Sequence, residues 1–240
     1  MRRRNHWASL SVQTLIALMV LISTAWSEDR IVEASDDNDA EQIAEPVPSR
    51  FGEAPIDEAY GAFQRGLYLT ARNLAMPRAE DGDAAAQALL AEIYSRGLGV
   101  GRDVEMAAFW YEKAAEQGVP EAQFQFALLL LQRSEKESEE YKRASELMKE
   151  AADNDNAEAQ FNYAQLILSE RPGSAGQIAA FDYFKAAAEN DIADAQYAVS
   201  QYYLVGTGNV VVDVEEARRC LERAAAQNFD TAQFELGNMI

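Results

Sequence analysis

Histidine and cysteine are almost absent from this sequence. Among 240 residues there is one histidine, His6, and one cysteine, Cys220. His6 lies in an N-terminal segment that we expect to be removed, so the remaining chain would have no histidine to activate a nucleophile or to ligate a metal. A single cysteine cannot form an internal disulfide. We therefore expect a non-enzymatic protein with no catalytic residue, no metal site and no cofactor.

Basic residues are also scarce. Lysine and arginine number 21 against 40 aspartates and glutamates, which gives a formal net charge of −19 at pH 7. Proteins that bind nucleic acid neutralise phosphates with basic side chains, so this balance argues against a nucleic-acid partner.

Long hydrophobic runs are missing as well. The apolar run Leu15–Ile22 is shorter than the roughly 20 residues that a membrane-spanning helix needs. It follows the three arginines Arg2–Arg4 and precedes the small residues Ala25 and Ser27. This order is typical of a secretory signal peptide at residues 1–27, cleaved after Ser27. We expect an exported protein, periplasmic or secreted, that is bound to the membrane only if the segment stays uncleaved.

The next segment, residues 28–55, is rich in Asp, Glu, Ser and Pro and has little apolar periodicity. Such a segment buries too little surface to offset its ordering entropy, so we interpret it as a disordered acidic linker. Helical patterns begin at Asp57 and continue to the end of the chain.

The helical region repeats itself every 36 or 37 residues. Three columns of alanine keep this period five times over. They are Ala71, Ala107, Ala144, Ala180 and Ala217; Ala79, Ala115, Ala152, Ala188 and Ala225; and the alanines of an Ala-Gln pair, Ala86, Ala122, Ala159, Ala195 and Ala232. A fixed period of this size is typical of a solenoid in which each unit buries its apolar face on its neighbours.

The unit at residues 84–121 shows what each repeat contains. Apolar residues recur at helical spacing in both halves, and the glycines of Gly97–Gly101 can end one helix and reverse the chain. Asp103 is placed as an N-cap for the second helix, Gly118 ends that helix, and Pro120 suits the first turn of the next.

This pattern resembles the Sel1-like repeat, a relative of the tetratricopeptide repeat. The residues that carry the resemblance are Ala86-Gln87, Tyr94, Gly97, Gly99, Val100, Asp103, Ala107, Trp110-Tyr111, Ala114-Ala115 and Gly118. The repeat from Asp194 keeps Tyr203, Gly206, Gly208, Val210, Asp213 and Ala224-Ala225, whereas the turns at residues 133–140 and 170–176 depart from the motif. The resemblance implies an all-α fold, a right-handed α/α solenoid of helix pairs.

We place this solenoid at residues 56–240. Its units would be residues 57–83, 84–120, 121–157, 158–193 and 194–230, with a partial unit at 231–240. The partial unit offers Phe234, Leu236, Met239 and Ile240 without a polar substitution, so we expect either a truncated array or self-association through this open end.

Cys220 shares a repeat column with Leu74, Trp110, Leu147 and Tyr183. We expect this column to face the core and Cys220 to be a buried small hydrophobe.

The resemblance implies that the first helix of each pair lines a concave face. If positions are counted from the alanine of Ala-Gln as zero, positions 3, 6 and 10 would be exposed there. They supply the candidate partner-binding residues Glu92, Arg96, Gln125, Gln132, Asn162, Gln165 and Gln201. Amide side chains can both donate to and accept from a peptide backbone. The glutamine at position 1 and the aromatic residue at position 2 are instead expected to cap a neighbouring helix and to pack between repeats.

We therefore interpret the chain as an exported scaffold or regulator that binds a protein or peptide partner. The resemblance extends to exported Sel1-like regulators of exopolysaccharide synthesis. Two alternatives stay open: a cell-wall or β-lactam hydrolase of the secreted repeat branch, and a membrane-tethered assembly factor. The Ser-x-x-Lys and Lys-Thr-Gly motifs of serine β-lactamases are absent.

Overall fold

The computed structural model describes residues 57–239, and this part of the chain is helical with no strand. The predicted all-α solenoid is therefore confirmed. The signal peptide predicted at residues 1–27 and the linker predicted at 28–55 lie outside the described residues.

The helices follow one another in pairs separated by short turns. Their bounds are α2 (Glu58–Gln64), α3 (Tyr68–Glu80), α4 (Ala84–Arg96), α5 (Val104–Glu116), α6 (Pro120–Arg133), α7 (Glu139–Asp153), α8 (Ala157–Glu170), α9 (Ser174–Glu189), α10 (Ala193–Val205), α11 (Val214–Ala226) and α12 (Asp230–Asn238), with a short 3₁₀ turn η2 (Thr207–Asn209) before α11.

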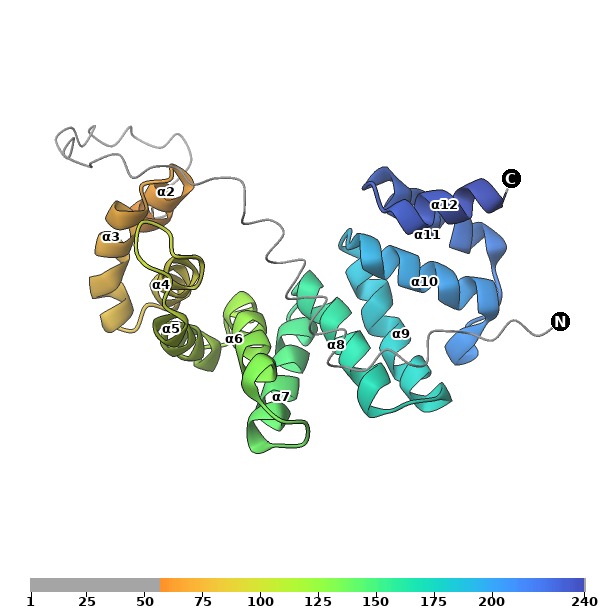
Figure 1. The fold of residues 1–240 in the computed structure, drawn as a ribbon, viewed down its shortest axis with the longest axis horizontal. Helices are drawn as coiled ribbons and strands as arrows, with labels where there is room; N and C mark the ends of the chain where they lie inside the picture. The colour runs from red at the N-terminus through yellow and green to blue at the C-terminus, as the bar shows by residue number, and fades with distance from the viewer. Residues whose placement is uncertain (1–56, 240) are drawn as a thin grey trace, which may run out of the picture.

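The pairs are stacked along an arc. Figure 1 shows α2 and α3 at one end, α6 and α7 at the middle and α11 and α12 at the other end. Each helix packs chiefly against the helices before and after it in the chain. We call α4, α6, α8, α10 and α12 the inner helices and α3, α5, α7, α9 and α11 the outer helices. At the bottom of the arc, α6 and α8 lie on its inner side and α7 lies outside them (Figure 1).

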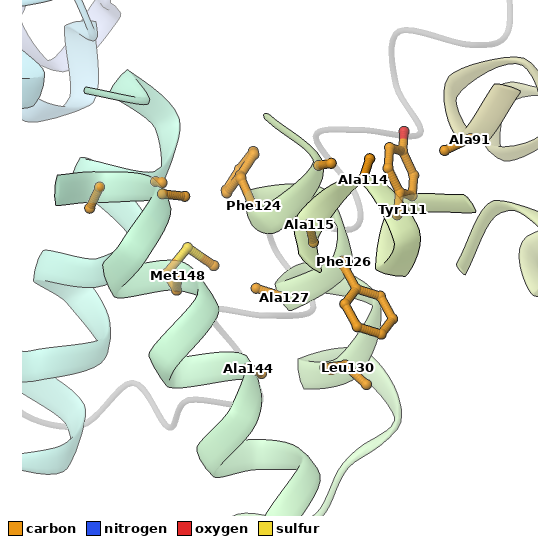
Figure 2. Packing of buried hydrophobic residues seen from close by; sticks show 14 of the residues in the cluster. Ala91, Tyr111, Ala114, Ala115, Phe124, Phe126, Ala127, Leu130, Ala144 and Met148 are labelled. Carbon is orange, nitrogen blue, oxygen red and sulfur yellow. The ribbon is translucent and has the colours of Figure 1, made fainter. Parts of the chain in front are cut away.

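The alanine columns are the points of closest packing. All members of the two columns that begin at Ala71 and Ala86 are at most 1% exposed. Figure 2 shows how Ala115, Ala127 and Ala144 lie between α5, α6 and α7 beside the larger Phe126 and Met148. A methyl group at these positions lets two helix backbones approach while the large side chains fill the space between them. Most of this packing forms one continuous core that runs from α2 to α10.

The predicted local signals of the unit at residues 84–120 are confirmed. Gly97 ends α4 in the left-handed conformation, with φ 67°. Asp103 caps α5, since its carboxylate accepts a hydrogen bond of 2.9 Å from the backbone N–H of Met106. Pro120 occupies the first turn of α6.

Two of the turns are built around a second glycine that touches the preceding repeat. A Cβ at Gly99 would lie 3.1 Å from Cβ of Tyr68, and one at Gly208 would lie 3.1 Å from the backbone of Gln177. Both glycines have φ 65°, which disfavours any residue with a side chain. The Gly-x-Gly turn therefore packs each pair onto the N-terminus of the outer helix before it.

The two middle turns reverse the chain without a Gly-x-Gly sequence. The turn between α6 and α7 has no glycine and places Glu137 at φ 73°. The turn between α8 and α9 contains only residues 171–173. The short turn is followed by a long helix, since α9 begins already at Ser174. Gly176 is buried in the first part of α9, where a Cβ would lie 1.8 Å from the carbonyl oxygen of Arg171. This close approach explains why residue 176 is a glycine, since any side chain there would clash with Arg171.

The prediction that the Cys220 column faces the core is wrong in part. Within that column Trp110 is buried, but Cys220, Leu147 and Tyr183 are only half-buried and Leu74 is 37% exposed. The column lies at the edge of the buried face of each outer helix, where burial differs from one repeat to the next.

Candidate protein-binding surface

The inner helices bury one side and expose the opposite side. Positions 0, 1 and 4 of these helices, counted from the alanine of Ala-Gln, are buried in α4, α6, α8 and α10. Positions −1, 3, 6 and 10 fall on the other side of a 3.6-residue helix. Because the inner helices pack chiefly against outer helices, this other side points away from the outer layer, toward the inside of the arc.

We call this surface the inner stripe. It consists of the exposed and half-buried residues at those positions: Ala85, Glu92, Arg96, Glu121, Gln125, Leu128, Gln132, Glu158, Asn162, Gln165, Ser169, Asp194, Ala198, Gln201 and Val205. The equivalent position 3 of α4, Leu89, is buried instead. All seven candidate residues from the sequence lie on this stripe, on four successive inner helices.

Glu92 and Arg96 form an ion pair within α4, at 2.9 Å. Glu92 also accepts a hydrogen bond of 2.9 Å from the hydroxyl of Tyr111. Burial, and the nearby Glu92 carboxylate, raise the pKa of Tyr111 far above its usual value, so this hydroxyl stays a donor. These contacts tie Glu92 to α5 and give it a structural role beside any binding role.

The amides of the stripe differ in what they already bind. Gln125 donates to Glu121 at 2.8 Å, and Asn162 donates to the backbone carbonyl of Glu158 at 2.7 Å. Gln201 reaches α12, where it donates to Glu235 at 2.7 Å. Gln132 and Gln165 make no side-chain hydrogen bond within residues 57–239. In each of these bonds the amide nitrogen is the donor, so the amide oxygen stays free to accept.

The carboxylates at position −1 belong to the same surface and were not predicted from the sequence. Glu121, Glu158 and Asp194 are the second residues of three successive inner helices and are exposed. Glu121 also accepts a hydrogen bond of 2.9 Å from the amide of Asn156, the N-cap of α8. The carboxyl of Asp194 contacts solvent, yet surrounding protein removes part of its hydration and raises its pKa. The regular spacing of these acids was the signal that could have revealed them.

The glutamines at position 1 cap the preceding outer helix, as predicted. The side-chain amides of Gln87, Gln160 and Gln196 are buried and donate to the carbonyls of Ala79, Ala152 and Ala188 at 3.0–3.3 Å. Their oxygens in turn accept from the residue that ends the next outer helix, Gln117, Asn190 or Gln227, at 2.8–3.1 Å. We call this chain of amides the glutamine ladder. It lies inside the solenoid and is not available to a partner.

The aromatic residues at position 2 pack between repeats, also as predicted. Phe124 and Tyr197 are buried; Tyr197 packs in one cluster with Ala232 of the next unit, and its hydroxyl donates to Glu235 of α12 at 2.9 Å. Burial and Glu235 together raise the pKa of Tyr197 to about 12. Phe234, the equivalent residue of α12, is 71% exposed. Self-association through this face stays a prediction.

The described residues show no other obvious chemistry. Within residues 57–239 there is no group of three or more His, Cys, Asp or Glu side chains placed to hold a metal ion. No helix in the same range is long and apolar enough to cross a membrane.

Fold and surface together define a helical-repeat solenoid with an exposed inner face. The family model described as Sel1 repeat matches residues 84–119, 157–192 and 193–229. The chain therefore contains three Sel1 repeats. One of the two units with a divergent turn, residues 157–192, is matched all the same.

Solved structures agree with this assignment. A Sel1 repeat protein from Oxalobacter formigenes is 26% identical with a TM-score of 0.64, over 75% of this chain and 73% of that chain. A protective antigen present in uropathogenic Escherichia coli strains, described as having an SLR fold, is 28% identical with a TM-score of 0.63, over 75% of this chain and 39% of that chain. An immunity protein from Pseudomonas aeruginosa is 19% identical with a TM-score of 0.50, a likeness of fold alone. Comparison with curated proteins gives no match.

Proposed function

We propose that this chain is an exported, non-enzymatic scaffold that binds a protein or peptide partner along its inner stripe. The observation that carries the proposal is the stripe itself. Four successive inner helices expose matched positions on the same side, and solenoids use such extended concave surfaces for binding. Export is supported by the N-terminal sequence, with Arg2–Arg4 before the apolar run Leu15–Ile22. A regulatory role in the cell envelope is the narrower function that the family resemblance suggests.

The amides at the centre of the stripe are the residues to test. Gln125, Asn162 and Gln165 lie on α6 and α8, and their hydrogen bonds are made within their own helices or not at all. Replacing them by alanine removes donors and acceptors for a partner without leaving a buried polar group unpaired.

The experiment is affinity capture of the full chain from its own envelope fraction, followed by mass spectrometry. We expect the triple variant Gln125→Ala, Asn162→Ala and Gln165→Ala to retain less partner than the natural sequence. Its melting temperature should hardly change, because substitutions of exposed residues usually shift stability by about 0.5 kcal/mol or less.

A triple variant on the outer helices serves as the control. Asn73→Ala, Glu146→Ala and Asp182→Ala change three exposed residues of α3, α7 and α9, and we expect this variant to keep the partner. Equal capture by the two variants and the natural sequence would show that the inner stripe is not the binding surface. The intact mass of the exported protein tests cleavage after Ser27 in the same preparation.

A further inference from the structure

Basic side chains are nearly absent from the inner helices. In α4, α6, α8 and α10 the only ones are Arg96 and Arg133, both at the C-terminal end of a helix. Each is already in an ion pair, Arg96 with Glu92 at 2.9 Å and Arg133 with Glu105 of α5 at 3.6 Å. No basic residue of these four helices is left to neutralise the acids of the inner stripe.

The outer helices carry more bases. Many of their acids stand three or four residues from a base on the same helix and pair with it, whereas Glu140, Glu146 and Asp182 form no ion pair within residues 57–239. The pairs include Glu139 with Lys142, Asp153 with Lys149, Glu189 with Lys185, Glu215 with Arg218 and Glu216 with Arg219. Pairs at this spacing are the usual way in which a solvated helix face balances its charge.

The inner acids lack this balance. Glu121, Glu158 and Asp194 occupy the same position in three successive repeats, and none of them forms an ion pair within residues 57–239. The residue four positions later, where a base would pair with each, is Gln125, Asn162 or Ala198. An acid in the first turn stabilises the start of a helix. That effect does not require the residue four positions later to be uncharged in all three repeats.

We propose that the inner stripe binds an extended peptide segment that carries lysine or arginine, with its cations paired to Glu121, Glu158 and Asp194. This inference rests on the proposed function and names the class of partner. The amides of Gln125, Asn162 and Gln165 lie next to the acids and supply hydrogen bonds to the backbone of such a segment. One carboxylate in each repeat favours a partner that lies along the solenoid, since its positive charges must recur with the repeats.

The test measures binding of a defined probe to the full chain. The probe is a fluorescein-labelled peptide of alternating lysine and serine, and its counterpart has glutamate in place of lysine. We expect the lysine peptide to raise fluorescence anisotropy at low salt and the glutamate peptide to leave it unchanged. Salt should weaken the binding, because exposed charges are screened.

Two variants with the same change in net charge separate the inner stripe from the acidity of the whole protein. The inner variant is Glu121→Gln, Glu158→Gln and Asp194→Asn. The control is Glu140→Gln, Glu146→Gln and Asp182→Asn, which removes three exposed acids from the outer helices. The loss of three exposed ion pairs should raise the Kd of the inner variant about tenfold, while the control should stay within about twofold of the natural sequence. Far-ultraviolet circular dichroism checks that both variants keep their helices.

Equal weakening in both variants would assign the binding to net charge and overturn the inference. Binding of the lysine peptide no better than the glutamate peptide would do the same. The proposed function can survive that result. If the alanine variant of the amides loses the captured partner while the inner acid variant keeps it, the stripe binds a partner that is not basic. If neither variant loses the partner, the proposed function fails as well.

Discussion

The glutamine ladder should be one of the main stabilising features between repeats, and Gln160 offers a direct test. Gln160 is 3% exposed. Its side-chain nitrogen donates to the carbonyl of Ala152 at 3.3 Å, and its oxygen accepts from the amide of Asn190 at 3.1 Å. These two bonds join the ends of two successive outer helices through the inner helix between them.

Gln160→Met keeps the length of the side chain and removes both bonds. A hydrogen bond contributes about 1 kcal/mol net, so the variant should lose about 2 kcal/mol of stability. The loss should not be much larger, because the carbonyl of Ala152 still accepts from the backbone N–H of Asp155 and Asn190 can turn to water. In a helical domain of this size the melting temperature should fall by about 4–8 °C.

Gln233→Met is the matched control. Gln233 donates to the carbonyl of Ala225 at 3.1 Å in the same geometry, but it is exposed. Water can replace its bond, and we expect a change of about 0.5 kcal/mol or less. Urea unfolding followed by circular dichroism measures both variants. A loss at Gln160 as small as that at Gln233 would refute the argument that the buried ladder stabilises the stack.

Two further predictions concern single residues. Gly176→Ala should destabilise the protein by about 3 kcal/mol or more, because its Cβ would meet the carbonyl oxygen of Arg171 at 1.8 Å. Gly61→Ala, in open space on α2, should instead add roughly 0.5–1 kcal/mol, and thermal unfolding that shows the two variants alike would contradict this contrast. Burial raises the pKa of the Cys220 thiol, so less thiolate exists near pH 8 and iodoacetamide should alkylate the folded chain more slowly than the chain in urea. Equal alkylation rates at that pH would show that the thiol is not shielded.

Much of the fold could be predicted from periodicity because each signal was repeated. The alanine columns predicted where the helices lie and which helices pack together. Single capping residues predicted where the helices begin and end. Asp103, for example, was expected as an N-cap and precedes α5, which begins at Val104. The glutamines were expected to cap helices, and they do.

Two features could not be predicted from the sequence, because they depend on how closely neighbouring helices and turns approach each other. Gly176 looks like a loop glycine, but the turn between α8 and α9 is so short that Arg171 lies directly over it. The column of Cys220 was expected to be buried because Trp110 is a member. Burial at the edge of a helix face depends on what covers each side chain, and within this column it ranges from the buried Trp110 to Leu74, which is 37% exposed.

The three acids of the inner stripe were also not recognised from the sequence alone. Read along the sequence, Glu121, Glu158 and Asp194 are ordinary acids in the first turn of a helix, as Glu139 and Glu215 are. The structure shows that Glu139 and Glu215 pair with bases on their own helices, while the three inner acids form no ion pair within residues 57–239. The net charge of −19 alone does not locate a binding surface, because many acids of the outer helices are paired with a base while these three acids are not. A partner that recognises this protein by charge should recognise the inner stripe, which is why the two triple variants with equal net charge are the decisive comparison.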